Sequence, residues 1–381
     1  MSVVIIGGGQ GGFQVAASLR AEGYQEPITI IGDEPGVPYQ RPPLSKGYLL
    51  GKQEQRSVEL RPAAFYETHR ITLVTAHATT IDREARRVKL DSGEQIDYDT
   101  LVLATGARNR LLNREGVFYL RTLAEAAELR QRLREARAIA ILGGGFIGLE
   151  IAAAARMLGK QVTVIEALPR LMARVVAPVV SEYFREQHTL QGVEVLLNAT
   201  TSDLGGQDLV IAGIGVVPNV ELALQAGLLV GNGITVNEYL RTPDERIYSV
   251  GDCCECPNPF AEMCVRLESV QNAVDQAVCV AKAMVGHAAP YASVPWFWTD
   301  QYDIHLQMAG LPAGYDQVVT RGDPHTRKFS VFYFRGERLC GVDSINRPAE
   351  HLTARKLIGA RSTLSPDQAR DESFDLKTAA N

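Results

Sequence analysis

The sequence predicts an α/β protein that contains two dinucleotide-binding units. Residues 3–33 and residues 138–166 each contain, in order, an apolar strand, a glycine-rich turn, a helical stretch, a second apolar strand and a terminal acidic residue. This order is typical of a strand–helix–strand unit with parallel strands. The chain has 381 residues, enough for two or three domains, and its 46% hydrophobic and 22% charged residues fit a packed protein better than a disordered one.

The net charge and the apolar stretches argue against two classes of protein. Lysine and arginine total 39 against 44 for aspartate and glutamate, and this net charge of −5 argues against binding nucleic acid over the whole surface. The longest uncharged apolar stretch, residues 138–149, has twelve residues, whereas a membrane span needs about twenty. The N-terminus has neither a basic segment nor a cleavage site, so we expect a cytoplasmic protein without a membrane segment.

Neither the cysteines nor the histidines predict a metal site. All six cysteines lie at or after Cys253 without CxxC spacing, and the seven histidines fall in no metal-ligand spacing. Cys253, Cys254 and Cys256 lie close together in the sequence, and we interpret them as small packing residues. We therefore expect no metal.

The first glycine motif joins the two strands of residues 3–33. Gly7 is expected to make the tight turn, Gly9 to let the backbone approach a pyrophosphate, and Gly12 to let the helix pack closely on the strand. The helix N-terminus then offers N–H donors and partial positive charge to phosphates. Asp33 ends the second strand, where it can accept hydrogen bonds from an adenosine ribose, although a solvated strand end would also explain it.

The second glycine motif repeats the first. Gly143, Gly145 and Gly148 take the same three places, and Glu166 ends the second strand. As for Asp33, a solvated strand end would also explain Glu166. A carboxylate that binds the ribose favours NADH over NADPH, because it would repel the 2′-phosphate of NADPH, although Arg170 lies four residues further on and would weaken this preference.

Two dinucleotide sites in one chain predict a redox enzyme. The simplest chemical reason for two dinucleotides is hydride transfer from a nicotinamide to a flavin. Residues 101–108 and residues 209–218 are short apolar segments that we expect to cross between the two units, the first forwards and the second back.

Several further motifs make the chain resemble a known family. They are YQRPPLSK at 39–46, ATG at 104–106, GGGFIGLE at 143–150, IAGIGVVP at 211–218, VGD at 250–252, PWFWTDQ at 295–301 and VDSINRP at 342–348. In this order they resemble the two-dinucleotide-fold flavoprotein reductases, and within them the FAD-dependent ferredoxin reductases of oxygenase systems. The resemblance covers almost the whole chain.

The resemblance implies a fold and an activity. It implies two Rossmann-like domains, an FAD-binding domain of residues 1–113 and 240–293 and an NAD-binding domain of residues 114–239, followed by a C-terminal α+β domain of residues 294–381. The implied reaction passes a hydride from NADH to FAD and then single electrons to a two-iron two-sulfur ferredoxin that feeds an oxygenase. The ferredoxin, the oxygenase and the oligomeric state stay open.

The resemblance also implies roles for single residues. Lys46 is expected near the reactive edge of the flavin in an ion pair with Glu150, and Trp298 beside the flavin where nicotinamide enters, with a core aromatic as the alternative. These three are the predicted catalytic residues. The other implied flavin contacts are Arg41, Ala78, Ala104, Thr105, Gly106, Arg121, Gly251, Asp252 and Val270. The implied NAD contacts beyond the second glycine motif are Ile147 and Gly215.

Two segments depart from a simple expectation. Residues 199–208 are shorter than the β-meander that the family usually has there, so this region is either a trimmed meander or a deletion. From Ser365 the composition turns polar and charged, so we expect the last residues to be poorly ordered.

Other functions within the same fold remain as alternatives. A disulfide or peroxide reductase needs a thiol against the flavin, and the chain has no cysteine before Cys253, which nearly excludes it. A signalling flavoprotein resembling apoptosis-inducing factor and a thiol-independent NADH oxidase stay open.

The ferredoxin partner predicts a basic docking surface. Ferredoxins of this type are acidic, so a reductase with a net negative charge needs local positive charge near the flavin. The candidates are Arg347, Arg355, Lys356 and Arg361 in the C-terminal domain. A solvated helix face without a partner is the alternative.

Overall fold

The structure, a computed structural model, describes residues 1–380, which form two compact units. Unit 1 consists of Met1–Gln40, Arg56–Arg108 and Val217–Ser293. Unit 2 consists of Arg41–Gln55, Asn109–Val216 and the chain from Val294 onward. The α/β class predicted from the two glycine motifs is confirmed. The predicted limits of the FAD, NAD and C-terminal domains divide the chain by function, and they stay a prediction.

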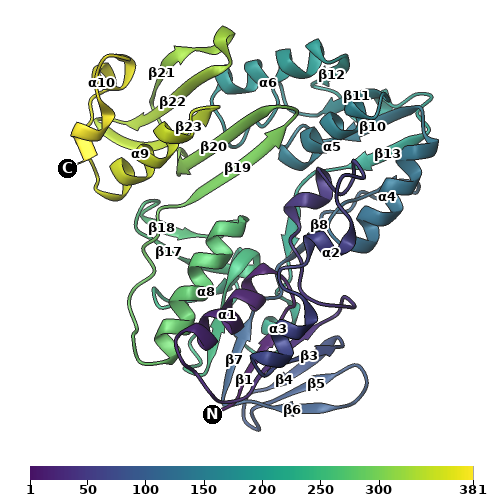
Figure 1. The fold of residues 1–381 in the computed structure, drawn as a ribbon, viewed down its shortest axis with the longest axis vertical. Coiled ribbons are helices and arrows are strands. Elements are labelled where there is room, and N and C mark those ends of the chain that lie inside the picture. The colour runs from purple at the N-terminus through teal and green to yellow at the C-terminus, as the bar shows by residue number, and fades with distance from the viewer. Residues whose placement is uncertain (381) are drawn as a thin grey trace. The chain divides into compact units, whose positions relative to one another are not determined.

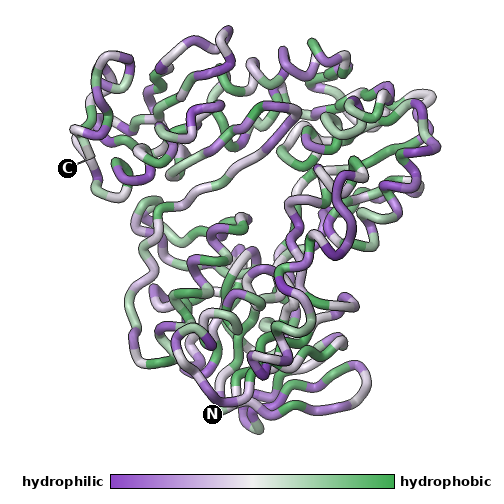
Figure 2. Tube along the Cα trace, in the orientation of Figure 1, coloured by the Kyte–Doolittle hydropathy of each residue, from purple (hydrophilic) through white to green (hydrophobic). Residues whose placement is uncertain are grey.

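Unit 1 is built on a five-stranded parallel sheet with strand order β16-β7-β1-β2-β3. Its strands are β1 (Val3–Ile6), β2 (Ile28–Gly32), β3 (Ile71–Thr75), β7 (Thr100–Leu103) and β16 (Ile247–Ser249). Two helices of this unit, α1 (Gln10–Ala21) and α8 (Val270–Met284), lie side by side (Figure 1). The inner strands are nearly continuous hydrophobic runs (Figure 2), as expected where helices or loops cover both faces of a parallel sheet.

Smaller elements complete unit 1. A three-stranded sheet is formed by β4 (Ala78–Asp82), β5 (Arg87–Leu90) and β6 (Gln95–Asp97), and another by β15 (Ile234–Thr235), β17 (Cys254–Asn258) and β18 (Met263–Val265). The short helices are α2 (Gln55–Val58, which begins on the last residue of a unit 2 segment), α3 (Ala63–Thr68), α7 (Glu221–Gln225) and the 3₁₀ turn η3 (Gly251–Cys253).

Unit 2 contains a second five-stranded parallel sheet, with strand order β12-β11-β10-β13-β9. Its strands are β9 (Val117–Phe118), β10 (Ala138–Leu142), β11 (Gln161–Glu166), β12 (Val193–Leu197) and β13 (Leu209–Ala212). The helices are α4 (Leu123–Glu135), α5 (Phe146–Met157), α6 (Pro178–Leu190) and the 3₁₀ turn η1 (Pro42–Ser45). The short segment 199–208 contains one 3₁₀ turn, η2 (Thr201–Asp203), between β12 and β13.

The two segments expected to cross between the units contain paired strands. β8 (Ala107–Asn109) and β14 (Val216–Pro218) form a two-stranded sheet. The division between unit 1 and unit 2 falls inside both strands, so the crossing predicted for residues 101–108 and 209–218 is confirmed.

The C-terminal part of unit 2 is a five-stranded antiparallel sheet with helices, as the predicted α+β class requires. The strand order is β19-β20-β23-β22-β21, with β19 (Trp296–Gln301), β20 (Ile304–Gly310), β21 (Gln317–Asp323), β22 (Lys328–Arg335) and β23 (Arg338–Ile345). The helices are α9 (Pro348–Gly359), α10 (Pro366–Arg370) and the 3₁₀ turns η4 (Pro324–Thr326) and η5 (Leu376–Ala380). α9 packs on β20 and β23 (Figure 1).

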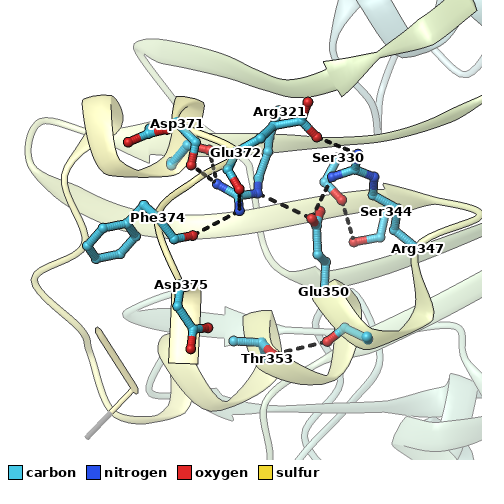
Figure 3. A network of polar contacts seen from close by, with 12 residues as sticks. Arg321, Ser330, Ser344, Arg347, Glu350, Thr353, Asp371, Glu372, Phe374 and Asp375 are labelled. Atoms are coloured by element: carbon cyan, nitrogen blue, oxygen red, sulfur yellow. Dashed lines mark hydrogen bonds and ion pairs between the residues drawn. The ribbon is translucent and has the colours of Figure 1, made fainter. Parts of the chain in front are cut away.

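Within residues 1–380 the expectation of a poorly ordered C-terminal segment is wrong, because one buried arginine binds residues 369–374, while Asn381 lies outside the described residues. Arg321 in β21 has a side chain only 7% exposed and donates hydrogen bonds to four backbone carbonyls and to Glu350 (Figure 3). The carbonyls are those of Ala369, Asp371, Glu372 and Phe374. Arg347 adds ion pairs of 2.6 Å to both Glu350 and Glu372. A polar composition therefore did not prevent order, since the polar groups here are partners of a buried charge.

We expect Arg321→Met to release the C-terminal segment, because four carbonyls and a carboxylate would lose their donor. The loss should destabilise the attachment of residues 369–374 by about 2 kcal/mol or more. Limited proteolysis should then cleave this segment at least about tenfold faster, since 1.4 kcal/mol corresponds to a factor of ten.

Arg370→Met is the matched control, because Arg370 is 59% exposed and pairs with Asp367 on its own helix. A surface substitution of this kind should change stability by no more than about 0.5 kcal/mol. Equal cleavage rates for the two variants would show that Arg321 does not hold the segment.

Candidate functional site

The first glycine motif of unit 1 contains two glycines that the fold needs and one that it does not. Gly7 has φ +122°, and a Cβ on it would lie 2.0 Å from the carbonyl oxygen of Ala104. A Cβ on Gly12 would lie 2.0 Å from the carbonyl oxygen of Gly7. Gly9, the N-cap of α1, has an ordinary φ of −83°, and a Cβ there would meet nothing within 4 Å. The bare backbone at Gly9 thus faces open space at a helix N-terminus, which fits the approach of a pyrophosphate.

The second glycine motif, in unit 2, repeats this distribution. A Cβ on Gly143 would lie 2.6 Å from the carbonyl oxygen of Gly213, and one on Gly148 would lie 2.1 Å from that of Gly143. A Cβ on Gly145 would have its nearest neighbour at 3.9 Å. Packing within the protein therefore does not require a glycine at the middle position of either motif. Both helix N-termini leave room for a dinucleotide phosphate.

The two acidic residues that end the second strands differ in their contacts. Asp33 follows β2 and is exposed. Glu166 ends β11, and its carboxylate accepts hydrogen bonds from the backbone N–H groups of Gly144 at 2.6 Å and Leu168 at 2.8 Å. Glu166 therefore fastens the glycine loop itself, a role that the sequence did not indicate.

The other predicted NAD contacts lie near the second motif. Ile147 is in the first turn of α5 and is 43% exposed, which is unusual for a large apolar side chain in a helix that is otherwise mostly buried. Gly215 lies between β13 and β14 with φ +98°, and a Cβ on it would meet nothing within 4 Å.

In unit 1, the ATG turn that follows β7 is held by a residue that sequence reasoning missed. The Thr105 hydroxyl donates to the backbone carbonyl of Asn219 at 2.6 Å, and the Asn219 side-chain amide donates to the carbonyl of Thr105 at 2.9 Å. Asn219 also donates its backbone N–H to the carbonyl of Gly106 at 3.0 Å. These reciprocal bonds hold Ala104, Thr105 and Gly106 in one conformation. Asn219 directly follows the IAGIGVVP motif, which was the available signal.

The remaining flavin candidates of unit 1 occupy different environments. Gly251 has φ +80° and donates its N–H to the Gln276 side chain at 2.7 Å, and Asp252 is half-buried in the same turn, η3. Val270 is the first residue of α8 and is half-buried. Ala78 is only 7% exposed and belongs to a hydrophobic cluster of the unit, so packing alone explains a small residue there.

The cysteines are small packing residues in the structure, as interpreted. Cys253, Cys254 and Cys256 are all free thiols and at most 2% exposed. Burial is the main cause that raises the pKa of the Cys254 thiol. Within residues 1–380 no group of three or more histidine, cysteine or acidic side chains is arranged to hold a metal ion, and no helix is long and apolar enough to cross a membrane.

In unit 2, Lys46 and Glu150 form the ion pair that the resemblance implies. The Lys46 ammonium lies 2.7 Å from a carboxylate oxygen of Glu150, a residue of α5 that is 4% exposed. The Ser45 hydroxyl donates to the same oxygen, and the Thr299 hydroxyl of β19 donates to the other at 2.6 Å. A buried carboxylate needs such donors to stay ionised. Ser45 and Thr299 were missed, although both lie inside the motifs YQRPPLSK and PWFWTDQ.

Two further candidates of unit 2 are also brought together. Arg41 donates to the backbone carbonyl of Arg121 at 2.5 Å. Arg121 in turn donates its backbone N–H to the carboxylate of Glu125, the residue that also closes the capping box of α4 with Thr122. The segment that precedes Lys46 is thereby fixed to the start of α4.

Trp298 lies on the opposite face of β19 from Thr299, because successive strand residues point to opposite faces. Its ring is 5.6 Å from that of Trp296, which in turn lies 5.3 Å from the buried His351 of α9. The structure therefore groups Lys46 with Glu150 and places Trp298 in a separate aromatic cluster.

The four predicted docking residues differ in their contacts and in their exposure. Arg347 is bound in ion pairs with Glu350 and Glu372. Arg355 stacks its guanidinium over the ring of Trp296 at 4.8 Å. Lys356 and Arg361 are exposed. A docking role for these four residues stays a prediction.

Comparison with known proteins identifies the family. Residues 1–277 match the family described as pyridine nucleotide-disulphide oxidoreductase, and residues 296–380 match the reductase C-terminal family. The chain belongs to the pyridine nucleotide-disulphide oxidoreductases. The resemblance to FAD-dependent ferredoxin reductases is confirmed, and FAD and NADH, the predicted cofactors, are those of this group.

Particular relatives match the chain over its whole length. Rhodocoxin reductase of Rhodococcus erythropolis is 50% identical over 402 aligned positions, which cover 100% of this chain and 94% of the relative. Putidaredoxin reductase of Pseudomonas putida is 39% identical, covering 99% of this chain and 96% of the relative. The solved ferredoxin reductase for the CYP199A2 system of Rhodopseudomonas palustris has a TM-score of 0.97 with 44% identity, and each chain is covered completely.

We expect Gly145→Ala to weaken NADH binding without destabilising the fold, because the added Cβ meets no protein atom within 3.9 Å but occupies the space of the pyrophosphate. The KM for NADH with ferricyanide as acceptor should rise about tenfold, a loss of roughly 1.4 kcal/mol.

Gly148→Ala is the comparison, since its Cβ would lie 2.1 Å from a backbone oxygen and should lower the melting temperature by several degrees. A normal KM for NADH in Gly145→Ala would show that no ligand approaches this backbone.

Proposed function

We propose that the protein is an NADH-dependent ferredoxin reductase, which transfers a hydride from NADH to FAD and then single electrons to a two-iron two-sulfur ferredoxin that feeds an oxygenase. The observation that carries the proposal is the presence, in one chain, of two glycine motifs that each leave the same position free for a dinucleotide phosphate. The full-length similarity to rhodocoxin and putidaredoxin reductases supports the same activity. A similar solved structure, 39% identical with a TM-score of 0.95, is a complex of putidaredoxin reductase with putidaredoxin.

We infer that different residues bind different parts of FAD and NADH. FAD, when bound, converts a two-electron hydride transfer into two one-electron transfers. We infer that Gly9 and Asp33 bind the pyrophosphate and ribose of FAD, and that Gly251 and Asp252 face its ribityl chain. On the nicotinamide side, Gly145 admits the pyrophosphate and Glu166 favours NADH by its negative charge.

The catalytic roles are also proposals. We infer that Lys46 presents its ammonium to the reactive edge of the flavin, with Glu150 as its fixed partner. Trp298 is proposed to cover the flavin where nicotinamide enters, because an indole face can stack on the ring and yield to the nicotinamide. No general base is assigned, since hydride transfer itself needs none.

The alternatives predict different acceptors. A thiol-dependent reductase is disfavoured because the position next to Lys46 is Ser45, whose hydroxyl is bound to Glu150. A thiol-independent NADH oxidase would pass its electrons to oxygen. A signalling flavoprotein would turn over slowly with any acceptor.

NADH-driven reduction of cytochrome c, with and without two-iron two-sulfur ferredoxins, tests the proposal. We expect a rate that depends on added ferredoxin, and a kcat/KM for NADH at least tenfold above that for NADPH, corresponding to about 1.4 kcal/mol of discrimination.

Three outcomes would contradict the assignment. NADH consumption that depends on oxygen and ignores ferredoxin would indicate an oxidase. Slow turnover with every acceptor would indicate a signalling protein. Equal use of NADPH would reject the role of Glu166 while leaving the reductase activity standing.

For the docking surface, we expect the double variant Arg355→Glu with Lys356→Glu to slow electron transfer to ferredoxin about tenfold at low salt, because rim charges act on the association rate and on its salt dependence. Reduction of ferricyanide by NADH should be retained. Arg347 is unsuitable for this test, because it also holds the C-terminal segment through Glu372.

Arg134→Glu with Arg137→Glu is the matched control, since it reverses the same number of charges at exposed positions of unit 2. If both double variants reduce ferredoxin equally well, the partner docks elsewhere.

A further inference from the structure

A buried chain of hydrogen bonds extends from Glu150 through unit 2. The Thr299 hydroxyl bonds to Glu150 at 2.6 Å, and the Gln301 amide nitrogen bonds to the Thr299 oxygen at 3.3 Å. His188 of α6 bonds through Nε2 to the Gln301 carbonyl oxygen at 2.8 Å, and the Tyr302 hydroxyl lies 3.2 Å from His188 Nδ1. The first four of these side chains are at most 4% exposed.

The direction of every bond in this chain follows from the charge of Glu150. An ionised carboxylate only accepts, so the single hydroxyl hydrogen of Thr299 points to Glu150. The Thr299 oxygen then offers only a lone pair to Gln301, which must present its NH₂ group there and its carbonyl oxygen to His188. His188 must therefore carry its hydrogen on Nε2.

The far end of the chain has the protonation states that this direction requires. Burial lowers the pKa of His188, which keeps the ring neutral with a single N–H. Burial also raises the pKa of Tyr302, which keeps its hydroxyl protonated and able to donate to Nδ1. Each link thus supplies one donor, and all donors point toward Glu150.

The charged groups around Glu150 agree with an ionised carboxylate. Lys46 faces it across 2.7 Å. On α5 itself the other charged residue is Arg156, whose charge acts on Tyr302 at the far end. The facing residues of η1 and β19, Ser45 and Thr299, are neutral donors.

We propose that Thr299, Gln301, His188 and Tyr302 are positioning residues that hold the Glu150 carboxylate ionised and aimed at Lys46. Their link to flavin chemistry rests on the proposed function, through the placement of Lys46. This chain of hydrogen bonds does not conduct protons, because the Gln301 amide would have to lose a hydrogen from nitrogen and gain one on oxygen to pass a proton on. It acts by orientation and charge alone.

The tautomer of His188 provides a readout that is independent of activity. In holoenzyme labelled with ¹⁵N-histidine, we expect the His188 signals of a neutral ring with hydrogen on Nε2, assigned by their loss in His188→Gln. Glu150→Gln removes the charge that fixes the direction of the chain, so the tautomer signature should change. A charged ring, an Nδ1–H tautomer, or signals indifferent to Glu150→Gln would overturn the proposal.

A pair of variants at Thr299 tests the effect on Glu150 itself. Thr299→Val keeps the shape and removes a donor that holds the Glu150 carboxylate, so the pH profile of flavin reduction by NADH should change. We expect a rate about tenfold below wild type at pH 6 and near wild type at pH 8. Thr299→Ser keeps the hydroxyl and should restore the wild-type profile.

Ser330→Ala is the control, since it removes a buried hydroxyl that bonds to Ser344 in the same C-terminal sheet. It should leave the pH profile and the His188 signals unchanged. If Thr299→Val shows the wild-type pH profile, or if Ser330→Ala changes this profile equally, the hydrogen-bond chain does not position Glu150. A failure of ferredoxin reduction alone would reject the proposed function and leave the NMR result standing.

Discussion

A single buried carboxylate determines much of the arrangement of unit 2. Glu150 has almost no exposed surface, and a charge in that environment is stable only with close donors. These donors come from η1 and from β19, segments 105 and 149 positions away in the sequence. The need to satisfy one charge thus fixes the loop around Lys46, helix α5 and the first strand of the C-terminal sheet to one another.

The two glycine motifs illustrate a different constraint, which is the absence of side chains. In each motif, a side chain on the first or the third glycine would collide with a backbone oxygen of the protein, whereas a side chain on the second would not. A position kept bare without an internal reason points to an external one, and here a dinucleotide phosphate is the natural occupant. The repetition of this asymmetry in two units strengthens the assignment more than either motif does alone.

The parts of this fold that depend on short sequence intervals were predictable. Each strand–helix–strand unit lies within about thirty residues, and the glycines, Lys46 and Glu150 lie in compact motifs. The partners Thr299, Gln301 and His188 were not predictable, because they meet Glu150 or one another only after distant segments pack. The C-terminal segment was mispredicted for the same reason: its composition is polar, and the buried Arg321 that binds it lies almost fifty residues earlier.

The attachment of that segment has a consequence for biosynthesis. Arg321 lies in β21, the edge strand of the C-terminal sheet, but the carbonyls that accept its hydrogen bonds belong to residues 369–374, which leave the ribosome 48 to 53 positions later. Domains that precede it can fold as they emerge. Until residues 369–374 have been translated, the C-terminal domain contains a guanidinium that lacks most of its acceptors, so its folding cannot be completed before this segment has emerged.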